Sequence, residues 1–446
     1  MAENNLTNLT GKVSIPKAVP YALQQILAMF VTNLVPIWTI TTIARDAIAP
    51  ELVTALQQNA MIIAGLATLI QSTPLWKFGS GLPIYMGVSF TFIIPLSQIA
   101  FNHGYSAVVG AVIIGGIFEG LMGLTARYWK KIIAPIVSAT VVTGIGLSLL
   151  STATRSFGGG YVEDFGSIPF LVTGMVTMVS CILWQIFMKG TGKQLSILAG
   201  IAAGYITALC FGIVDFSGLN DMKLFALPRI LPFKPIFRLD AIISICIIYL
   251  VSATETIGDT TALAHGVLGR DASAQEISGA LMVDGFGSAL GGVFGVSPVT
   301  SYTENVGLTI MTKVINRNVT RVGACIMIFC GLFPPIGHFI QTIPTSVIGG
   351  VLLVVLGQIT VSGFQMMSEA GFTTRNKLIA SLSLAIGIGF TTASEAEIWL
   401  SFPIAIQSIF AQNIVAVMFV MALFLNLVLP RNMDENRPAE EHKNEQ

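Results

Sequence analysis

Residues 79–90 read GSGLPIYMGVSF, and residues 291–300 read GGVFGVSPVT. Each is a Gly- and Pro-interrupted stretch beside long apolar runs, and both residue types weaken or break helices. At membrane depth, irregular backbone is tolerated only where it is buried in protein or lines a water-filled cavity. Two interruptions at corresponding positions therefore predict two related halves, with a binding site where the halves meet.

The composition is that of a membrane protein. Of the 446 residues, 53% are hydrophobic and 10% are charged, and the mean hydropathy is +0.78. Soluble domains carry about 25% charged residues because their surfaces face water. Most of this surface is therefore expected to face the lipid bilayer. The net charge is zero, which gives no basic footprint for nucleic acid.

Apolar runs of about 20 residues, the length that spans a bilayer, predict about fourteen transmembrane segments. The long connection at 215–238 divides them into two sets of seven. Because seven is odd, equivalent segments must run in opposite directions, as in the inverted repeats of secondary transporters. The predicted segments are 18–40, 53–73, 81–98, 104–125, 131–152, 167–188, 194–214, 239–264, 275–295, 297–312, 319–341, 344–366, 377–394 and 402–429.

Basic residues predict the orientation, because cytoplasmic loops are enriched in Lys and Arg. With the amino terminus inside, 17 of the 23 Lys and Arg residues fall on the cytoplasmic side. We therefore expect a multi-pass protein of the cell membrane (inner or plasma membrane) with both termini cytoplasmic. Its parts are a cytoplasmic tail at 1–17, a first repeat at 18–214, an extracellular connection at 215–238, a second repeat at 239–430 and a cytoplasmic tail at 431–446.

Five carboxylates lie inside the predicted spans, where each charge costs at least about 2.5 kcal/mol on insertion scales. Glu255 and Asp259 are four residues apart, so a helix stacks them on one face. Because like charges repel, we expect one of them to hold a proton unless a cation bridges them. The five are Glu119, Glu255, Asp259, Asp284 and Glu304.

Several of these polar residues also fit a purely structural role. Asp284 lies in a Gly-rich stretch that it could brace, and Asp259 also suits helix packing or gating. Glu119 has no polar neighbour in sequence, so we expect a local hydrogen bond for it. The Gln24-Gln25 pair can serve a substrate or brace a neighbouring helix.

Metal and catalytic sites are not indicated. The five cysteines lie in apolar stretches, and no Cys/His grouping has the spacing of metal ligands. The four histidines are scattered, and no nucleophile is paired with a base. We therefore expect neither an enzyme, nor a metal, nor a cofactor beyond a coupling ion.

Residues 304–313, ENVGLTIMTK, resemble the signature of the nucleobase-ascorbate transporter family. That signature is Gln, Glu or Pro, then Asn, any residue, Gly, four residues, Thr, and Arg, Lys or Gly. Every fixed position matches. Residues 255–259, 81–90 and 284–285 resemble the eighth-, third- and ninth-span elements of the same family. The landmarks stand in the family's order over essentially the whole chain.

The resemblance implies an all-α polytopic membrane protein of fourteen spans in two inverted sevens. It further implies a core domain of spans one to four and eight to eleven, a gate domain, short strands in spans three and ten, and a homodimer. A nucleobase offers N–H donors, carbonyl acceptors and a flat ring, which carboxylates, backbone amides and an aromatic ring can meet. The implied substrate-binding residues are Glu255, Glu304, Phe90, Ser89, Asn305 and Gln25, and those implied in proton coupling or gating are Glu255, Asp259 and Asp284.

The motif residues point to two kinds of base. Asp259 resembles the xanthine and urate transporters, whereas Glu304 resembles uracil-type and ascorbate-type members. We predict a secondary transporter that imports a purine, xanthine or urate, by proton symport with an elevator-type movement of core against gate. Uracil is the alternative substrate, and sodium is the alternative coupling ion.

Two other transport classes share features with this chain. The sulfate-transporter group has the same overall architecture and carries anions. An anion site favours a basic residue or helix amino termini over facing carboxylates, so the acids argue against it. A channel is the second class, and a saturable, gradient-coupled flux would separate a carrier from a pore.

Overall fold

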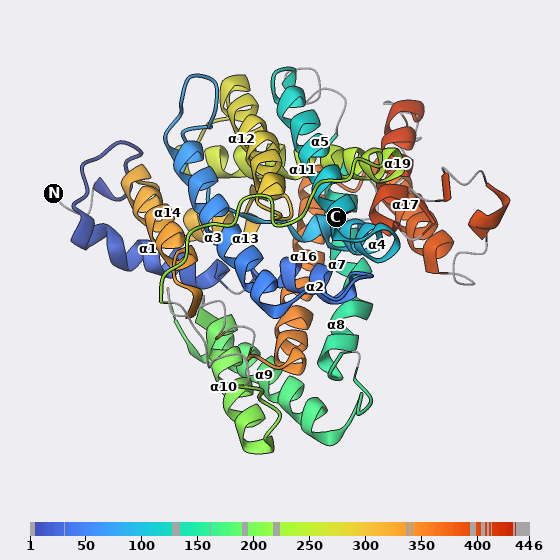
Figure 1. Cartoon of the computed structure of the whole chain (residues 1–446). Coiled ribbons are helices and arrows are strands. Elements are labelled where there is room, and N and C mark those ends of the chain that lie inside the picture. The colour runs from blue at the N-terminus through green and yellow to red at the C-terminus, as the bar shows by residue number, and fades with distance from the viewer. Residues whose placement is uncertain are drawn as a thin grey trace, which may run out of the picture.

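The computed structural model describes residues 5–30, 32–126, 134–160, 162–189, 195–216, 224–335, 339, 342–392, 398–402, 406–407, 410–411, 413–430 and 433. Over this part the chain is a bundle of helices around one small sheet (Figure 1). The predicted tail at 431–446 lies outside the described residues except for Met433, as do residues 1–4 of the other tail.

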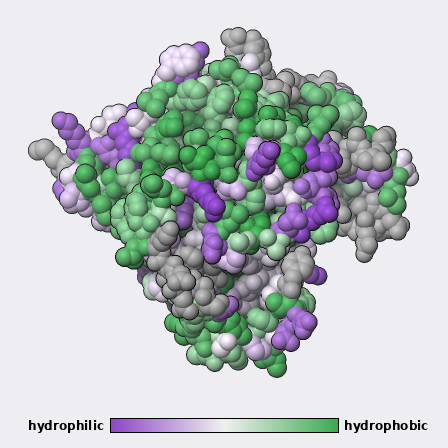
Figure 2. All heavy atoms as spheres, in the orientation of Figure 1, coloured by the Kyte–Doolittle hydropathy of each residue, from purple (hydrophilic) through white to green (hydrophobic). Residues whose placement is uncertain are grey.

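Six described helices are long and apolar enough to cross a membrane. Much of the surface in Figure 2 is correspondingly apolar, as expected for a surface in contact with lipid. The protein is therefore a multi-pass membrane protein. The six are α3 (Pro50–Ser72), α5 (Tyr105–Gly123), the consecutive α7 (Pro135–Ser148) and α8 (Leu150–Phe157), α9 (Ile168–Phe187), α11 (Leu239–Leu268) and α16 (Thr345–Ala370).

The remaining helices are shorter or more polar. The start of α12 is encoded locally, since Ser273 and Glu276 form a capping box that satisfies otherwise unpaired backbone donors. These helices are α1 (Ile15–Met29), α2 (Val35–Ile43), α4 (Ile93–His103), α10 (Ser196–Phe211), α12 (Ala274–Val293), α13 (Thr303–Thr312), α14 (Arg317–Gly331), α17 (Thr374–Thr392) and α19 (Ile414–Val428).

The two interrupted stretches of sequence pair with each other. Strand β1 (Met86–Val88) runs antiparallel to β2 (Val299–Ser301), with Met86 opposite Ser301. A short 3-10 helix, η2 (Phe90–Phe92), leads from β1 into α4, and α13 follows β2. The sheet is buried, so the irregular backbone lies inside protein.

The first predicted segment, 18–40, is divided into α1 and α2. Pro36 stands at the second position of α2, where its missing N–H is not needed. In the break, the Asn33 side chain turns to the sheet, and its Oδ1 accepts a hydrogen bond from the Val88 amide at 2.7 Å. The break therefore supports the start of η2 and the sheet beside it.

The helices form two packing groups. In the first, α5 packs on α11 and α12, α14 packs on α1 and α3, and α13 packs on α1 and α11. In the second, α16 packs on α7, α8 and α9, while α9 packs on α10 and α19 packs on α7 and α17. The groups meet where α11 touches α7 and α19 and where α1 touches α10.

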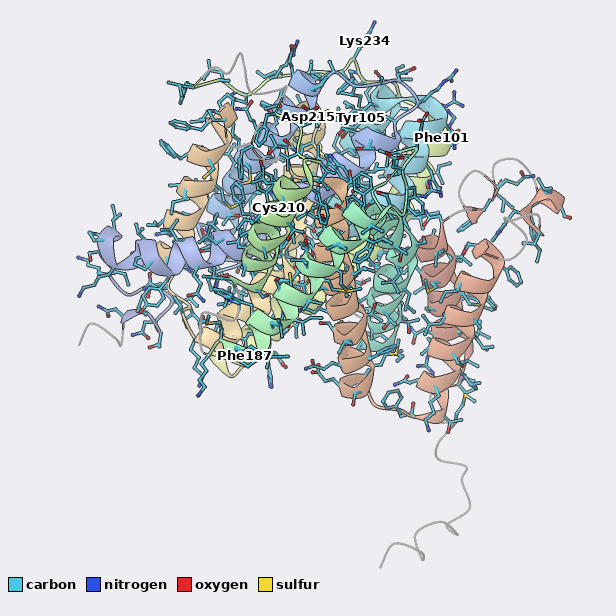
Figure 3. All side chains as sticks on the ribbon, turned by 90° about the horizontal axis from the view of Figure 1, so that it is seen from below. Phe101, Tyr105, Phe187, Cys210, Asp215 and Lys234 are labelled. Atoms are coloured by element: carbon cyan, nitrogen blue, oxygen red, sulfur yellow. The ribbon has the colours of Figure 1, made fainter. Side chains whose placement is uncertain are left out.

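The described part of the connection before α11 is fastened to the ends of other helices. Leu231 donates its amide to Val293 at 2.9 Å and Ile236 donates to Ser106 at 3.0 Å. The Tyr105 ring packs on Phe233, while nearby Lys234 extends outward (Figure 3). The starts of α5 and α11 and the end of α12 thus share one face of the molecule.

Candidate functional site

Glu255 and Asp259 lie one turn apart on α11, between η2 and β2. The two Glu255 oxygens accept hydrogen bonds from Thr91 Oγ1 at 3.1 and 2.9 Å. Asp259 Oδ2 accepts from Ser301 Oγ at 2.8 Å and from Thr303 Oγ1 at 3.0 Å. Each acid of α11 is therefore held by hydroxyls from one of the two interrupted segments.

Asp284 on α12 lies behind β2 and is fully buried. Its Oδ2 accepts a short hydrogen bond from Thr256 Oγ1 and a longer one, 3.4 Å, from the Ser301 amide. The hydroxyls of Thr256 and Ser301 are 3.3 Å apart. Because Ser301 also bonds Asp259, the two hydroxyls link Asp284 to Asp259 while Asp284 braces the strand.

Glu304 is the second residue of α13 and lines a cavity of about 310 Å³. Leu308 and Ala28 line the same cavity from the first packing group, and Gln185 and Gln358 line it from the second. Glu304 is an exposed residue, in contrast to the buried Asp259 and Asp284. The cavity therefore lies between the two packing groups, with a carboxylate on one wall and amides on the other.

Gln25 and Asn305 are placed against each other between α1 and α13. Asn305 Nδ2 donates to Gln25 Oε1 at 2.7 Å and to its backbone oxygen at 3.0 Å, and Gln25 Nε2 donates to Thr309 Oγ1 at 3.2 Å. Both residues are at most 4% exposed. This geometry favours the bracing role for Gln25, and substrate contact by either residue stays a prediction.

Ser89 and Phe90 stand at the end of β1. The Ser89 amide donates to the Pro298 carbonyl at 2.9 Å, and its hydroxyl accepts from the Thr91 amide at 3.3 Å. Phe90 is 8% exposed, so little of its ring is accessible in this conformation. The contact from this segment to Glu255 comes from Thr91 instead.

Sequence reasoning missed the hydroxyls of the site. Thr91, Thr256, Ser301 and Thr303 each bond an acid of the cluster. A signal was available, since Thr91, Thr256 and Thr303 lie inside or directly beside the stretches that carry the resemblance, and Ser301 directly follows the interrupted stretch 291–300. Threonine and serine are common in apolar helices, however, so their type alone did not single them out.

The acids interact with one another and not with a basic side chain. Glu304 interacts electrostatically with Glu255 and Asp259. The ion pairs found in the described part of the chain join other acids, Asp240 and Glu276. Nor do the described His, Cys, Asp and Glu residues form a group of three that could hold a metal ion. Uncompensated buried carboxylates are costly, which favours a site that binds protons and donor groups.

The local hydrogen bond that we expected for Glu119 has one candidate donor. The Ser252 hydroxyl of α11 lies beside the Glu119 carboxylate, although the two are outside strict hydrogen-bond geometry. On the other side α5 and α12 pack closely, since a Cβ added at Gly285 would lie 2.0 Å from the Gly120 nitrogen.

Comparison with known proteins decides the family. The model Xan_ur_permease, described as the Permease family, matches residues 16–396. The chain belongs to this permease family. It is 31% identical to the uric acid permease PucJ of Bacillus subtilis (strain 168), with 92% of each chain covered. It is 30% identical to the xanthine permease XanQ of Escherichia coli (strain K12), covering 93% of this chain and 91% of XanQ.

A solved structure supports the fold of this permease. The transmembrane domain of the cyanobacterial bicarbonate transporter BicA superposes with a TM-score of 0.55 at 15% identity, covering 94% of this chain and all of that one. At this identity the likeness concerns the fold alone. The permease thus shares its helical architecture with a membrane transporter.

Proposed function

We propose that this permease imports a purine base, xanthine or uric acid, together with protons. The permease relatives are named for these two substrates. The observation that carries the proposal is the acid cluster, in which Glu255, Asp259 and Glu304 interact where the interrupted segments meet. A cluster of hydrogen-bond acceptors without a paired basic side chain suits a neutral or weakly acidic nucleobase that presents N–H groups.

Substrate recognition would combine groups from both walls of the cavity. Glu304 on one wall accepts hydrogen bonds from ring N–H groups, and charge-assisted bonds of this kind are the strong ones. Glu255, which is not among the residues that line the cavity here, accepts in the same way once the site opens toward it. Gln185 and Gln358 on the opposite wall offer both donors and acceptors to the ring carbonyls. Phe90 stacks on the base when the site opens toward it, with Ser89, Asn305 and Gln25 positioning the segments that carry these groups.

Proton coupling follows from the cost of carboxylates in a membrane. A carboxylate that takes up a proton loses its charge, so the loaded site can cross a low-dielectric region at a lower cost. Glu255 is the proposed carrier, with Asp259 and Asp284 joined to each other through Thr256 and Ser301. The proton is then bound and released with the base.

The movement proposed is an elevator in which the first packing group is the core and the second is the gate. The cavity between them then passes from one side of the membrane to the other as the core slides. The fourteen spans, the two inverted repeats at 18–214 and 239–430, cytoplasmic termini and a homodimer belong to this same proposal.

Uptake measurements in cells test the substrate. Labelled xanthine and labelled uracil are each offered at two pH values and challenged with the other base and with uric acid. The proposal predicts saturable xanthine uptake that uric acid inhibits and that rises at the more acidic external pH. If neither base is taken up, the substrate assignment is wrong.

Uracil is the second candidate because of one observation. The residue that lines the cavity is Glu304, and a glutamate at this position of the signature resembles the uracil-type transporters. Uracil uptake that exceeds xanthine uptake in the same experiment would select this alternative. Anion transport is disfavoured, since the described contacts of the acid cluster include no basic side chain.

A further inference from the structure

Glu119 is a buried acid that the proposed substrate site does not use. It lies on α5 and is 0% exposed. There the backbones of α5 and α12 touch, since a Cβ at Gly116 would lie 2.5 Å from the Ala289 nitrogen and one at Gly285 would lie 2.0 Å from the Gly120 nitrogen. This close approach holds Glu119 beside Asp284, with which it interacts electrostatically.

The groups that face Glu119 supply no positive charge. From α12 it faces Asp284, and from α11 it faces Glu255, Tyr249 and Ser252. The Tyr249 hydroxyl donates to the Val112 carbonyl at 3.4 Å, so it is engaged elsewhere. Both Glu119 oxygens, Ser252 Oγ and Asp284 Oδ1 are outside hydrogen-bond geometry with the described residues. The Ser252 hydroxyl can donate to one Glu119 oxygen, so the other Glu119 oxygen and Asp284 Oδ1 still need a donor.

A proton supplies that donor. Two buried carboxylates without a cation cannot both be ionised at acceptable cost. When one of them is protonated, its O–H group can donate to the free oxygen of the other.

A hydroxyl path leads from this pair to the substrate site. Asp284 Oδ2 is bonded by Thr256 Oγ1, which is 3.3 Å from Ser301 Oγ. Ser301 Oγ in turn donates to Asp259 Oδ2 at 2.8 Å. A hydroxyl has one hydrogen and can also accept, so Thr256 must first turn its O–H from Asp284 to Ser301. A proton on Asp284 can then be passed along the two hydroxyls to Asp259.

We propose that Glu119 is a second proton-binding residue, which shares a proton with Asp284 and exchanges it with the substrate site through Thr256 and Ser301. In the transfer the O–H bond of Glu119 breaks and an O–H bond forms on Asp284 Oδ1. The Asp284 carboxyl then turns this O–H toward Thr256. Its proton passes to Thr256 Oγ1 as the Thr256 proton passes to Ser301 Oγ and the Ser301 proton passes to Asp259 Oδ2, so each hydroxyl gains and loses one proton. The inference rests on proton-driven uptake as the proposed function.

The test compares Glu119→Gln with wild type in proteoliposomes. The matched control is Glu51→Gln, an exposed glutamate in the first turn of α3. Two rates are measured with labelled xanthine: exchange at equal pH, and accumulation under a pH gradient. For one coupled proton, a gradient of about one pH unit supports about tenfold accumulation.

We expect E119Q to keep exchange within about twofold of wild type, well below the tenfold change that corresponds to one pH unit, and to lose accumulation. Glu119→Asp should regain accumulation with a shifted pH profile, because it again carries a proton.

Accumulation by E119Q equal to wild type would overturn the inference, as would loss of exchange in a folded E119Q protein. If E119Q does not fold, the pH dependence of accumulation by E119D is measured instead, and a dependence equal to that of wild type overturns the inference. Sodium-driven accumulation that E119Q abolishes would also overturn it. Wild-type protein that shows no proton-driven uptake contradicts the proposed function instead.

Discussion

At the scale of single residues, the acids divide by what surrounds them. Glu304 faces a cavity, Glu255 and Asp259 are held by hydroxyls, and Glu119 lies beside other acids with the Ser252 hydroxyl as its candidate donor. The cost of a charge in a membrane was enough to select all of these from the sequence. Their partners were not predictable, since the contact of Thr91 with Glu255 depends on the tertiary fold.

Replacing Glu304 tests the substrate contact. Glu304→Ala removes an acceptor of a charge-assisted hydrogen bond, so we expect KM for the base to rise about tenfold or more, equivalent to about 1.4 kcal/mol or more. Glu304→Gln keeps an acceptor oxygen and should raise KM less. Uptake kinetics in cells measure both, with Glu51→Ala as the surface control. An unchanged KM in E304A would remove Glu304 from the site.

At the scale of elements, the sequence located both interruptions but not how they meet. Gly and Pro predict irregular backbone near 79–90 and 291–300, where β1 and β2 are found. The register that sets Met86 opposite Ser301 is a tertiary property, supported by the bond from Val88 to Asn33. The sequence did not predict the division of 18–40 into α1 and α2, because the hydrophobicity of the segment is continuous.

The contact of α5 with α12 is tested by Gly285→Ala. The added Cβ would lie 2.0 Å from the Gly120 nitrogen, so the helices must separate, and overpacking of this kind costs about 1–3 kcal/mol. We expect a lower Tm in detergent and less folded protein. Gly389→Ala on α17 is the control, since its Cβ meets nothing within 4 Å. Equal Tm values for the two variants would contradict the close packing.

At the scale of the whole molecule, composition alone predicted a multi-pass membrane protein, and the helices and the family agree. The sequence placed a binding site where the halves 18–214 and 239–430 meet, and this stays a prediction. The cavity lies between two packing groups that each take helices from both halves. Which helices form each group depends on contacts distant in sequence, such as α14 on α3. The hydrophobic pattern carries no information on such pairs.

Cross-linking tests the proposed movement. Leu308 on α13 and Val355 on α16 line the cavity from opposite groups. In a background without the native cysteines, joining L308C to V355C with a cleavable thiol reagent should stop uptake until the link is reduced. The control pair is Y205C with T342C, whose native hydroxyls are 2.7 Å apart on α10 and directly before α16. Normal uptake by the linked L308C/V355C protein would contradict an elevator.

The central claim is that this permease couples a proton to a purine base through the carboxylates of α11. The most direct measurement is accumulation of labelled xanthine or uric acid in proteoliposomes under an imposed pH gradient, comparing wild type with Glu255→Gln. The account predicts that wild type concentrates the base, that dissipating the gradient abolishes this, and that E255Q does not concentrate it. Accumulation by E255Q at the wild-type rate would contradict the account.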